Sequence, residues 1–154
     1  MGFDLYGVKP NITTPEPPKP EMNGERWTDE ELEQYDKWDE WRVKSGGYFR
    51  ANVWFWRPLW MFVSGVCDDI LTEKDILRGE YNEGHRISKT KSEKIAKRLY
   101  SMLDNGQVED YEREFKRERE SLADDNWNKH YPFDKQVVRE FADFCANCGG
   151  FEIC

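Results

Sequence analysis

The sequence has few histidines and no long hydrophobic run. With only His85 and His130, a hydrolase triad or a metallohydrolase centre would have to be built almost entirely from acidic residues. The chain contains no H-E-x-x-H motif, nucleophile elbow, P-loop or G-x-G-x-x-G fingerprint. Its most apolar stretch, residues 53–66, is broken by Arg57 and Pro58 and is too short to cross a bilayer. We therefore expect no membrane span, and an enzyme is the weaker hypothesis.

Basic residues are also scarce: 31 acidic residues stand against 23 lysines and arginines, a net charge of −8. Nucleic-acid binders need a basic face that displaces counterions from phosphates, so nucleic acid is not expected as a partner. The N-terminal sequence MGFDLYG lacks the charged and apolar regions of a secretory signal. We therefore expect a cytoplasmic location, in which the cysteines are reduced.

What the chain does have is aromatic and charged residues, at 15% and 35% of its 154 positions. So many aromatic residues exclude a fully disordered chain, and the length fits a single domain over 1–154. We expect a mainly α fold, with four to five helices around an aromatic core. A small β element should join the two ends of the chain, residues 3–6 and 151–154, which makes the fold α+β.

Capping signals and apolar periodicity predict the helices. Thr28 and Glu31 form a capping box that starts a helix over 29–44. Its apolar residues recur at every third position and are expected to form a buried stripe: Leu32, Tyr35, Trp38 and Trp41. Further helices are expected over 57–67, after Thr72, over 89–104, over 108–122 and from Asp134 to 148. Since proline favours the first turn of a helix, the stretch up to Trp56 is expected to be extended or loosely helical.

The predicted helices over 89–104 and 108–122 differ in charge. Residues 85–100 hold six basic residues and one acidic residue, whereas residues 101–125 hold nine acidic and four basic residues. This contrast favours an antiparallel hairpin whose two helices are joined by surface charge pairs.

The helix over 29–44 and the segment before it are the candidate contact surfaces for a partner. Residues 27–40 hold seven acidic residues and one lysine. The acidic face is assigned to partner binding: Asp29, Glu30, Glu33, Asp36 and Glu40. The proline-rich surface segment at 10–26 is expected to run as polyproline II, either as a strap on the surface or as a flexible arm that docks on a partner.

The segment 50–60 interleaves arginine and tryptophan. Guanidinium groups and indoles together can stack on a base and hold a phosphate. The alternative small-molecule or nucleotide site therefore comprises Arg50, Asn52, Trp54, Trp56, Arg57, His85 and Arg86. The same segment can instead be a core edge in which the arginines stack on tryptophan and pair with acidic residues of the helix over 29–44, and we favour this structural interpretation.

The sequence offers two weak metal-site alternatives, and no cofactor is expected. The weak zinc alternative uses Cys145, Cys148 and Cys154, with Cys67 or a histidine as fourth ligand. However, the second ligand pair typical of zinc sites is missing, and the first two cysteines fall on the apolar stripe of a helix, where thiols behave as small hydrophobic groups. A metal-dependent enzyme centred on His85 would use acidic residues around it: Asp68, Asp69 and Glu83.

Four pieces of the sequence carry a resemblance: MGFDLYG, YFRANVWFWRPLW, GHRIS and FADFCANCGGFEIC. With them the chain resembles a group of small uncharacterised proteins of phages and bacterial genomes. The resemblance spans most of the chain and implies a context, an accessory protein of a mobile element acting in a bacterial cytoplasm. It implies no activity, cofactor or catalytic residue.

The leading hypothesis is thus a non-enzymatic phage or mobile-element protein that binds a protein of the bacterial host, for example an inhibitor of a defence system such as an anti-CRISPR protein. The alternatives are the small-molecule site in segment 50–60 and the metal-dependent enzyme. The sequence does not specify the oligomeric state.

Overall fold

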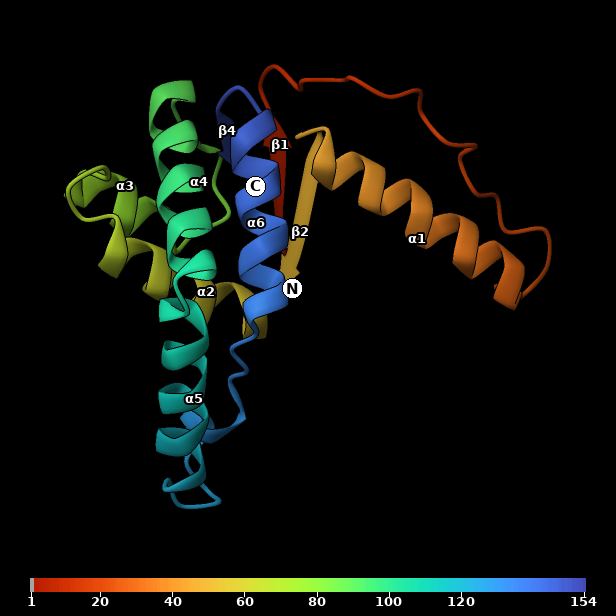
Figure 1. Cartoon of the computed structure of the whole chain (residues 1–154). Helices are drawn as coiled ribbons and strands as arrows, with labels where there is room; N and C mark the ends of the chain where they lie inside the picture. The colour runs from red at the N-terminus through yellow and green to blue at the C-terminus, as the bar shows by residue number, and fades with distance from the viewer. Residues whose placement is uncertain (1) are drawn as a thin grey trace.

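The computed structural model describes residues 2–154. Over this range the chain forms six α-helices, one 3-10 helix and four strands (Figure 1). The helices are α1 (Asp29–Lys44), α2 (Val53–Val66), α3 (Glu73–Arg78), α4 (Lys89–Asp104), α5 (Gln107–Glu120) and α6 (Lys135–Asn147), and the 3-10 helix is η1 (Trp127–His130). The strands are β1 (Gly2–Gly7), β2 (Tyr48–Asn52), β3 (His85–Ile87) and β4 (Phe151–Ile153). The expected mainly helical α+β fold is confirmed.

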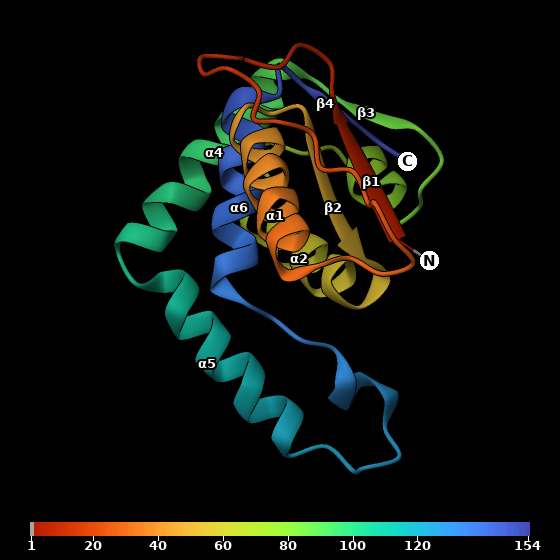
Figure 2. The same ribbon diagram turned by 90° about the vertical axis from the view of Figure 1, so that its right-hand side faces the viewer.

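The strands form one antiparallel sheet in the order β2–β1–β4–β3 (Figure 2). The predicted pairing of the chain ends is confirmed, with Leu5 opposite Ile153. Side chains alternate between the two faces of a strand. Accordingly Phe3, Leu5 and Ile153 are buried against the helices, while the outer face carries polar residues such as Arg50.

The core between the sheet and the helices is aromatic, as expected. Trp56 and Trp60 of α2 stack with their ring centroids 5.3 Å apart, and both are almost fully buried. Their indole N–H groups donate to the backbone carbonyls of Gly79 (2.8 Å) and Ile76 (2.9 Å). Gly79 has no room for a side chain, because a Cβ there would lie 2.1 Å from the Trp60 ring. These contacts fix α3 on α2.

The predicted start of α2 at residue 57 is wrong. The helix begins at Val53, because Asn52 caps it by accepting a hydrogen bond from the backbone N–H of Phe55 (3.1 Å). Pro58 therefore lies inside the helix, where it removes one hydrogen bond. Burial of the large side chains around it, Trp56 and Trp60 among them, offsets that loss.

The predicted antiparallel hairpin of α4 and α5 is also wrong. α4 packs beside α6, while α5 continues away from the end of α4 and extends beyond the sheet (Figures 1 and 2). The apolar residues of the two helices face different neighbours: Ile95 and Leu99 belong to the central core, and Phe115 packs on Phe133. Within residues 2–154 no ion pair joins the two helices.

Candidate functional site

Helix α1 and the proline-rich segment 10–26, together called the arm, project from the rest of the molecule, called the body (Figure 1). Val43, in the last turn, is the only buried residue of α1. The prediction of a buried stripe is therefore wrong: Trp38 and Trp41 are only half-buried, and in the outer half of the helix Leu32 is 44% exposed and Tyr35 is 37% exposed. The reason lies in the tertiary structure, because no element of the body packs on that half of the helix.

The proline-rich segment lies along α1 and covers one of its faces. The Trp41 indole N–H donates to the carbonyl of Thr14 (3.1 Å), and the Trp38 indole donates to the Glu16 carboxylate (2.9 Å). At the tip of the arm Glu31 accepts from the backbone N–H of Asn23 (3.2 Å). The segment is thus a surface strap on α1 rather than a free chain.

The root of the arm is fixed by aromatic, ionic and glycine contacts. The Arg42 guanidinium lies 3.9 Å from the Trp38 ring centroid and 4.1 Å from that of Tyr48 in β2, and it pairs with Asp39 (2.5 Å). In the turn after α1, Gly46 has a φ of +76°, and a Cβ there would lie 2.2 Å from the backbone of Asn147. The direction in which α1 leaves the body is therefore set by packing.

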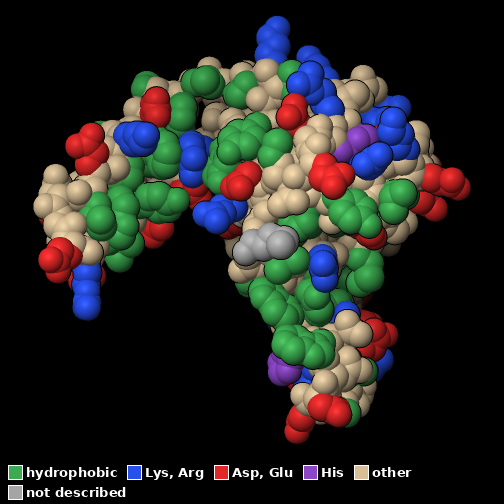
Figure 3. Space-filling view, turned by 180° about the vertical axis from the view of Figure 1, so that it is seen from behind, with side chains coloured by type: hydrophobic (Ala, Val, Ile, Leu, Met, Phe, Trp, Pro, Cys, Tyr) green, Lys and Arg blue, Asp and Glu red, His purple; other side chains and the backbone are tan. Residues whose placement is uncertain are grey.

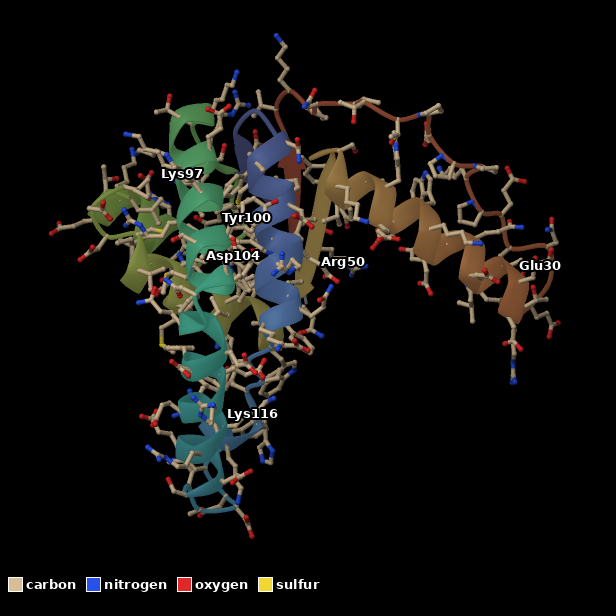
Figure 4. The ribbon with its side chains drawn as sticks, in the orientation of Figure 1. Glu30, Arg50, Lys97, Tyr100, Asp104 and Lys116 are labelled. Atoms are coloured by element: carbon tan, nitrogen blue, oxygen red, sulfur yellow. The ribbon has the colours of Figure 1, made fainter. Side chains whose placement is uncertain are left out.

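The five acidic residues predicted to bind a partner all lie on α1. Asp29 and Glu30 are in its first turn, and Glu30 marks the outer end of the arm in Figure 4. Glu33 pairs with Lys37 (2.8 Å), which lowers the pKa of Glu33, and Glu40 pairs with Lys44 (2.6 Å). Asp36 has no ion pair within the described chain. The exposed carboxylates of the arm are thus only partly neutralised.

A groove of about 340 Å³ lies at the root of the arm, between α1 and α6. It is lined by Asp36, Asp39, Glu40, Val43 and Lys44 of α1 and by Gln136, Glu140 and Asp143 of α6. Partial burial raises the pKa of the Glu140 carboxyl, and the negative charges of Asp134, Asp39 and Asp143 raise it further. Carboxylates from two helices therefore face one another with few cations between them.

Large apolar side chains are exposed next to these acids. Trp27, Leu32 and Tyr35 are each more than a third exposed, and the Trp27 and Tyr35 rings contact each other with centroids 5.9 Å apart. Seen from behind, the arm stands out from the body, with hydrophobic and acidic side chains side by side along it (Figure 3). A helix that combines these features can bind a protein surface.

The residues of the predicted nucleotide site are not brought together. Arg50 and Arg86 lie on the outer face of the sheet and pair with Asp4 (3.6 Å) and Glu152 (2.9 Å). Asn52 caps α2, Trp54 packs on Tyr131, and Trp56 is in the core. The expected pairing of the arginines with acids of α1 is wrong as well.

Two of those seven residues do line a common cavity, of about 420 Å³, between α2 and the chain around α3. They are Arg57, whose guanidinium donates to the Tyr131 hydroxyl (3.0 Å), and Trp56. The remaining walls are Trp60, Met61, Ser64, Ile76, Glu80 and Tyr81.

His85 takes part in a charged network that the sequence analysis missed. Its Nε2 lies 2.8 Å from one oxygen of Asp75, which is 5% exposed, and the Lys91 ammonium lies 2.5 Å from the other oxygen. Burial alone would raise the pKa of Asp75, but hydrogen bonds from Lys91, Thr72 and His85 hold it well below its ordinary value. The network joins α3, β3 and α4.

Two of the three acidic residues proposed for a metal site at His85 have other partners. Asp69 pairs with Arg98, and Glu83 pairs with Arg78 (3.2 Å). Among residues 2–154 no three His, Cys, Asp or Glu side chains converge in a way that could hold a metal ion.

The cysteines proposed for zinc differ in their burial and in the groups that they contact. Cys145 is fully buried in α6, and burial raises the pKa of its thiol well above the ordinary value. Cys148 donates to the Cys145 carbonyl (3.5 Å), whereas Cys154 is half-buried and contacts Glu152 (3.6 Å).

Sequence reasoning found the acidic face of α1 but missed the α6 side of the groove. Glu140 and Asp143 are three residues apart and so lie on one face of α6, but nothing local indicates that this face meets α1. None of the helices formed by residues 2–154 combines the length and apolar character of a membrane span. Compared with known proteins, the chain matches no family model, no curated protein and no solved structure.

Proposed function

We propose that this protein acts without catalysis, by binding another protein through the arm. The observation that carries the proposal is the exposure of Leu32 and Tyr35 on a helix whose inner end alone packs on the body. Large apolar side chains that stay exposed beside polar ones are typical of interaction surfaces. The cap and the strap hold α1 helical without a partner, which reduces the entropy lost on binding.

The resemblance to phage and bacterial proteins supports a cytoplasmic protein of the bacterial host as the partner. Inhibition of a host defence system, as by an anti-CRISPR protein, is the concrete form of this proposal. Expression of the protein should then raise the plating efficiency of a phage that the system targets, and Leu32→Asp should abolish that protection. Equal plating with and without the protein would exclude this form.

Binding itself is tested by affinity purification from a bacterial lysate with Leu32→Asp and Tyr35→Asp. Leu77→Asp is the matched control, because Leu77 is an exposed leucine on a helix of the body, at 56% against 44% for Leu32. A specific partner should be lost from the arm variants and retained by the control. Charge reversal at Asp29 and Asp36 should also weaken capture. A partner that binds all these variants equally would contradict the proposal.

The second candidate function is small-molecule binding in the cavity between α2 and α3. It is supported by the cavity volume of about 420 Å³ and by the combination of Arg57 with aromatic walls. It predicts that a nucleotide raises the melting temperature of the wild type but not that of Arg57→Ala. No shift across the common nucleotides would count against it.

A further inference from the structure

The uncovered face of α1 is continuous with the groove at its root. Leu32, Asp36, Asp39 and Val43 follow the spacing i, i+4, i+7 and i+11, so they share one face of the helix. The last three line the groove, and Tyr35, whose ring contacts those of Trp27 and Trp38, borders this face. The strap holds Trp38 and Trp41 on another face and leaves this one open.

Polarity changes along this face. Its outer end presents Leu32 and Tyr35, both exposed, and its inner end presents carboxylates from α1 and α6. Glu140 of α6 faces the negative charge of Asp39 of α1, although Asp39 pairs with Arg42. Lys44, which lines the groove, pairs with Glu40. Asp36 and Glu140 form no ion pair within residues 2–154, and a cation from outside would relieve the repulsion between the carboxylates of this groove.

The spacing of the apolar and acidic residues along this face defines which kind of segment can bind to it. Leu32 and Asp39 are two helical turns apart, about 10 Å along the axis. A segment lying along α1 must therefore present an apolar anchor at one end and a lysine or arginine about two turns away. A basic amphipathic helix meets this requirement, whereas a phosphate backbone or an anionic membrane would be repelled by the same carboxylates.

The most basic helix of a second copy of this chain does not supply such a segment. This helix, α4, carries Lys94 and Lys97, both of which are exposed (Lys97 is labelled in Figure 4). However, the apolar residues of α4, Ile95 and Leu99, are fully buried in its own core. Helix α4 of a folded copy therefore offers charge without apolar anchors.

We propose that the open face of α1 and the α1–α6 groove bind a basic amphipathic helix of the partner protein. Its apolar side chains lie on Leu32 and Tyr35, and a lysine or arginine enters between Asp36, Asp39 and Glu140. This inference rests on the proposed function, because it assigns a chemistry to the partner of the same arm.

The test uses the full-length protein and a synthetic helical peptide of leucine and lysine, about 18 residues long, with a glutamate-for-lysine peptide of the same pattern as the control. Titration calorimetry should show binding of the lysine peptide only. Asp36→Asn/Asp39→Asn/Glu140→Gln should weaken its affinity by about tenfold or more, as should Leu32→Ala. Raising the salt concentration from about 50 to 500 mM should weaken binding as well.

The matched control is Glu114→Gln/Glu118→Gln/Asp125→Asn, which removes three exposed carboxylates of α5 and the following loop and so changes the net charge equally. It should leave the affinity for the peptide within about twofold of the wild type. Equal weakening by both triple variants, or no binding of the lysine peptide at low salt, would overturn the inference. So would a dimer in sedimentation that depends on Leu32.

The two proposals fail in different ways. A host protein that is lost with Leu32→Asp, but retained at high salt and by the Asp36/Asp39/Glu140 variant, leaves the arm as the binding site and overturns only the basic helix. A host protein that is retained by every arm variant overturns the proposed function itself.

Discussion

The arm and the body use the same residue types in opposite ways. In the body, Trp56 and Trp60 are buried, and their indole N–H groups are satisfied by backbone carbonyls of the next helix. In the arm, Trp38 and Trp41 donate to a strap without secondary structure, and Leu32 remains exposed. Burial stabilises the body, whereas α1 depends on its cap, its charge pairs and its strap. Apolar side chains therefore make a core or a binding surface according to what covers them.

The largest expected loss of stability comes from removing a buried indole rather than an exposed one. Trp56→Ala should lower the free energy of unfolding by about 3 to 5 kcal/mol, because it leaves a cavity beside Trp60. Trp127→Ala is the control, since Trp127 is 72% exposed, and it should cost less than about 0.5 kcal/mol. Urea denaturation measures both. Similar losses would contradict the contrast between core and surface.

The next effect concerns the buried charge of the body. Asp75→Asn should cost about 2 to 3 kcal/mol at neutral pH, because Lys91 and His85 lose their partner. In the wild type the folded-state pKa of Asp75 lies below its ordinary value of 3.8. Its stabilisation is therefore complete above that pH and is lost as the pH falls below it.

The variant should accordingly lose stability less steeply than the wild type in acid. Denaturation curves between about pH 2 and 5 test this, and parallel curves for the two proteins would contradict the assigned network.

Loss of either capping box should have a smaller effect, which differs between the arm and the body. Thr28 caps α1 and Thr72 caps α3 with the same pattern of side-chain and backbone hydrogen bonds. Thr72→Ala should lower the global stability by about 1 kcal/mol, because α3 packs on the Trp56–Trp60 pair. Thr28→Ala should leave the global melting temperature nearly unchanged and speed amide hydrogen exchange in α1 alone. Equal changes in melting temperature would show that the arm unfolds together with the body.

The smallest expected change in the free energy of unfolding comes from a residue of the proposed interface. Leu32→Ala should change the free energy of unfolding by less than about 0.5 kcal/mol, since its side chain is largely exposed. The same variant is expected to weaken partner binding strongly. A large loss of stability would instead place Leu32 in a structural role.

Much of the fold could be predicted from local signals. The capping boxes at Thr28 and Thr72, and the serine cap at Ser88, give the helix starts, because a cap is a contact between residues close in sequence. The alternation of Phe3 with Leu5 and of Phe151 with Ile153 predicted the pairing of the chain ends. The cap at Asn52 could not be predicted locally, because Pro58 disfavours a helix interior and only the burial of the aromatic side chains around it offsets that cost.

The candidate site was predicted only in part. The acids of α1 follow from its composition, but Glu140 and Asp143 join them only where α6 passes the root of the arm. The sequence also did not predict that the arginine and tryptophan residues of segment 50–60 lie apart. The segment is divided between a strand and a helix, which direct neighbouring side chains to different faces.

Local sequence signals thus specify most helix starts and the acidic charge of α1, because these depend on neighbouring residues, and apolar alternation marks the two chain ends as strands. The tertiary structure decided which apolar stripe is covered. Periodicity marks a stripe as apolar on α1 and α6 alike, but only the packing of the whole chain buries Phe141 and Phe144 and leaves Leu32 exposed. The exposure on which the proposed function rests is therefore a property of the packed chain.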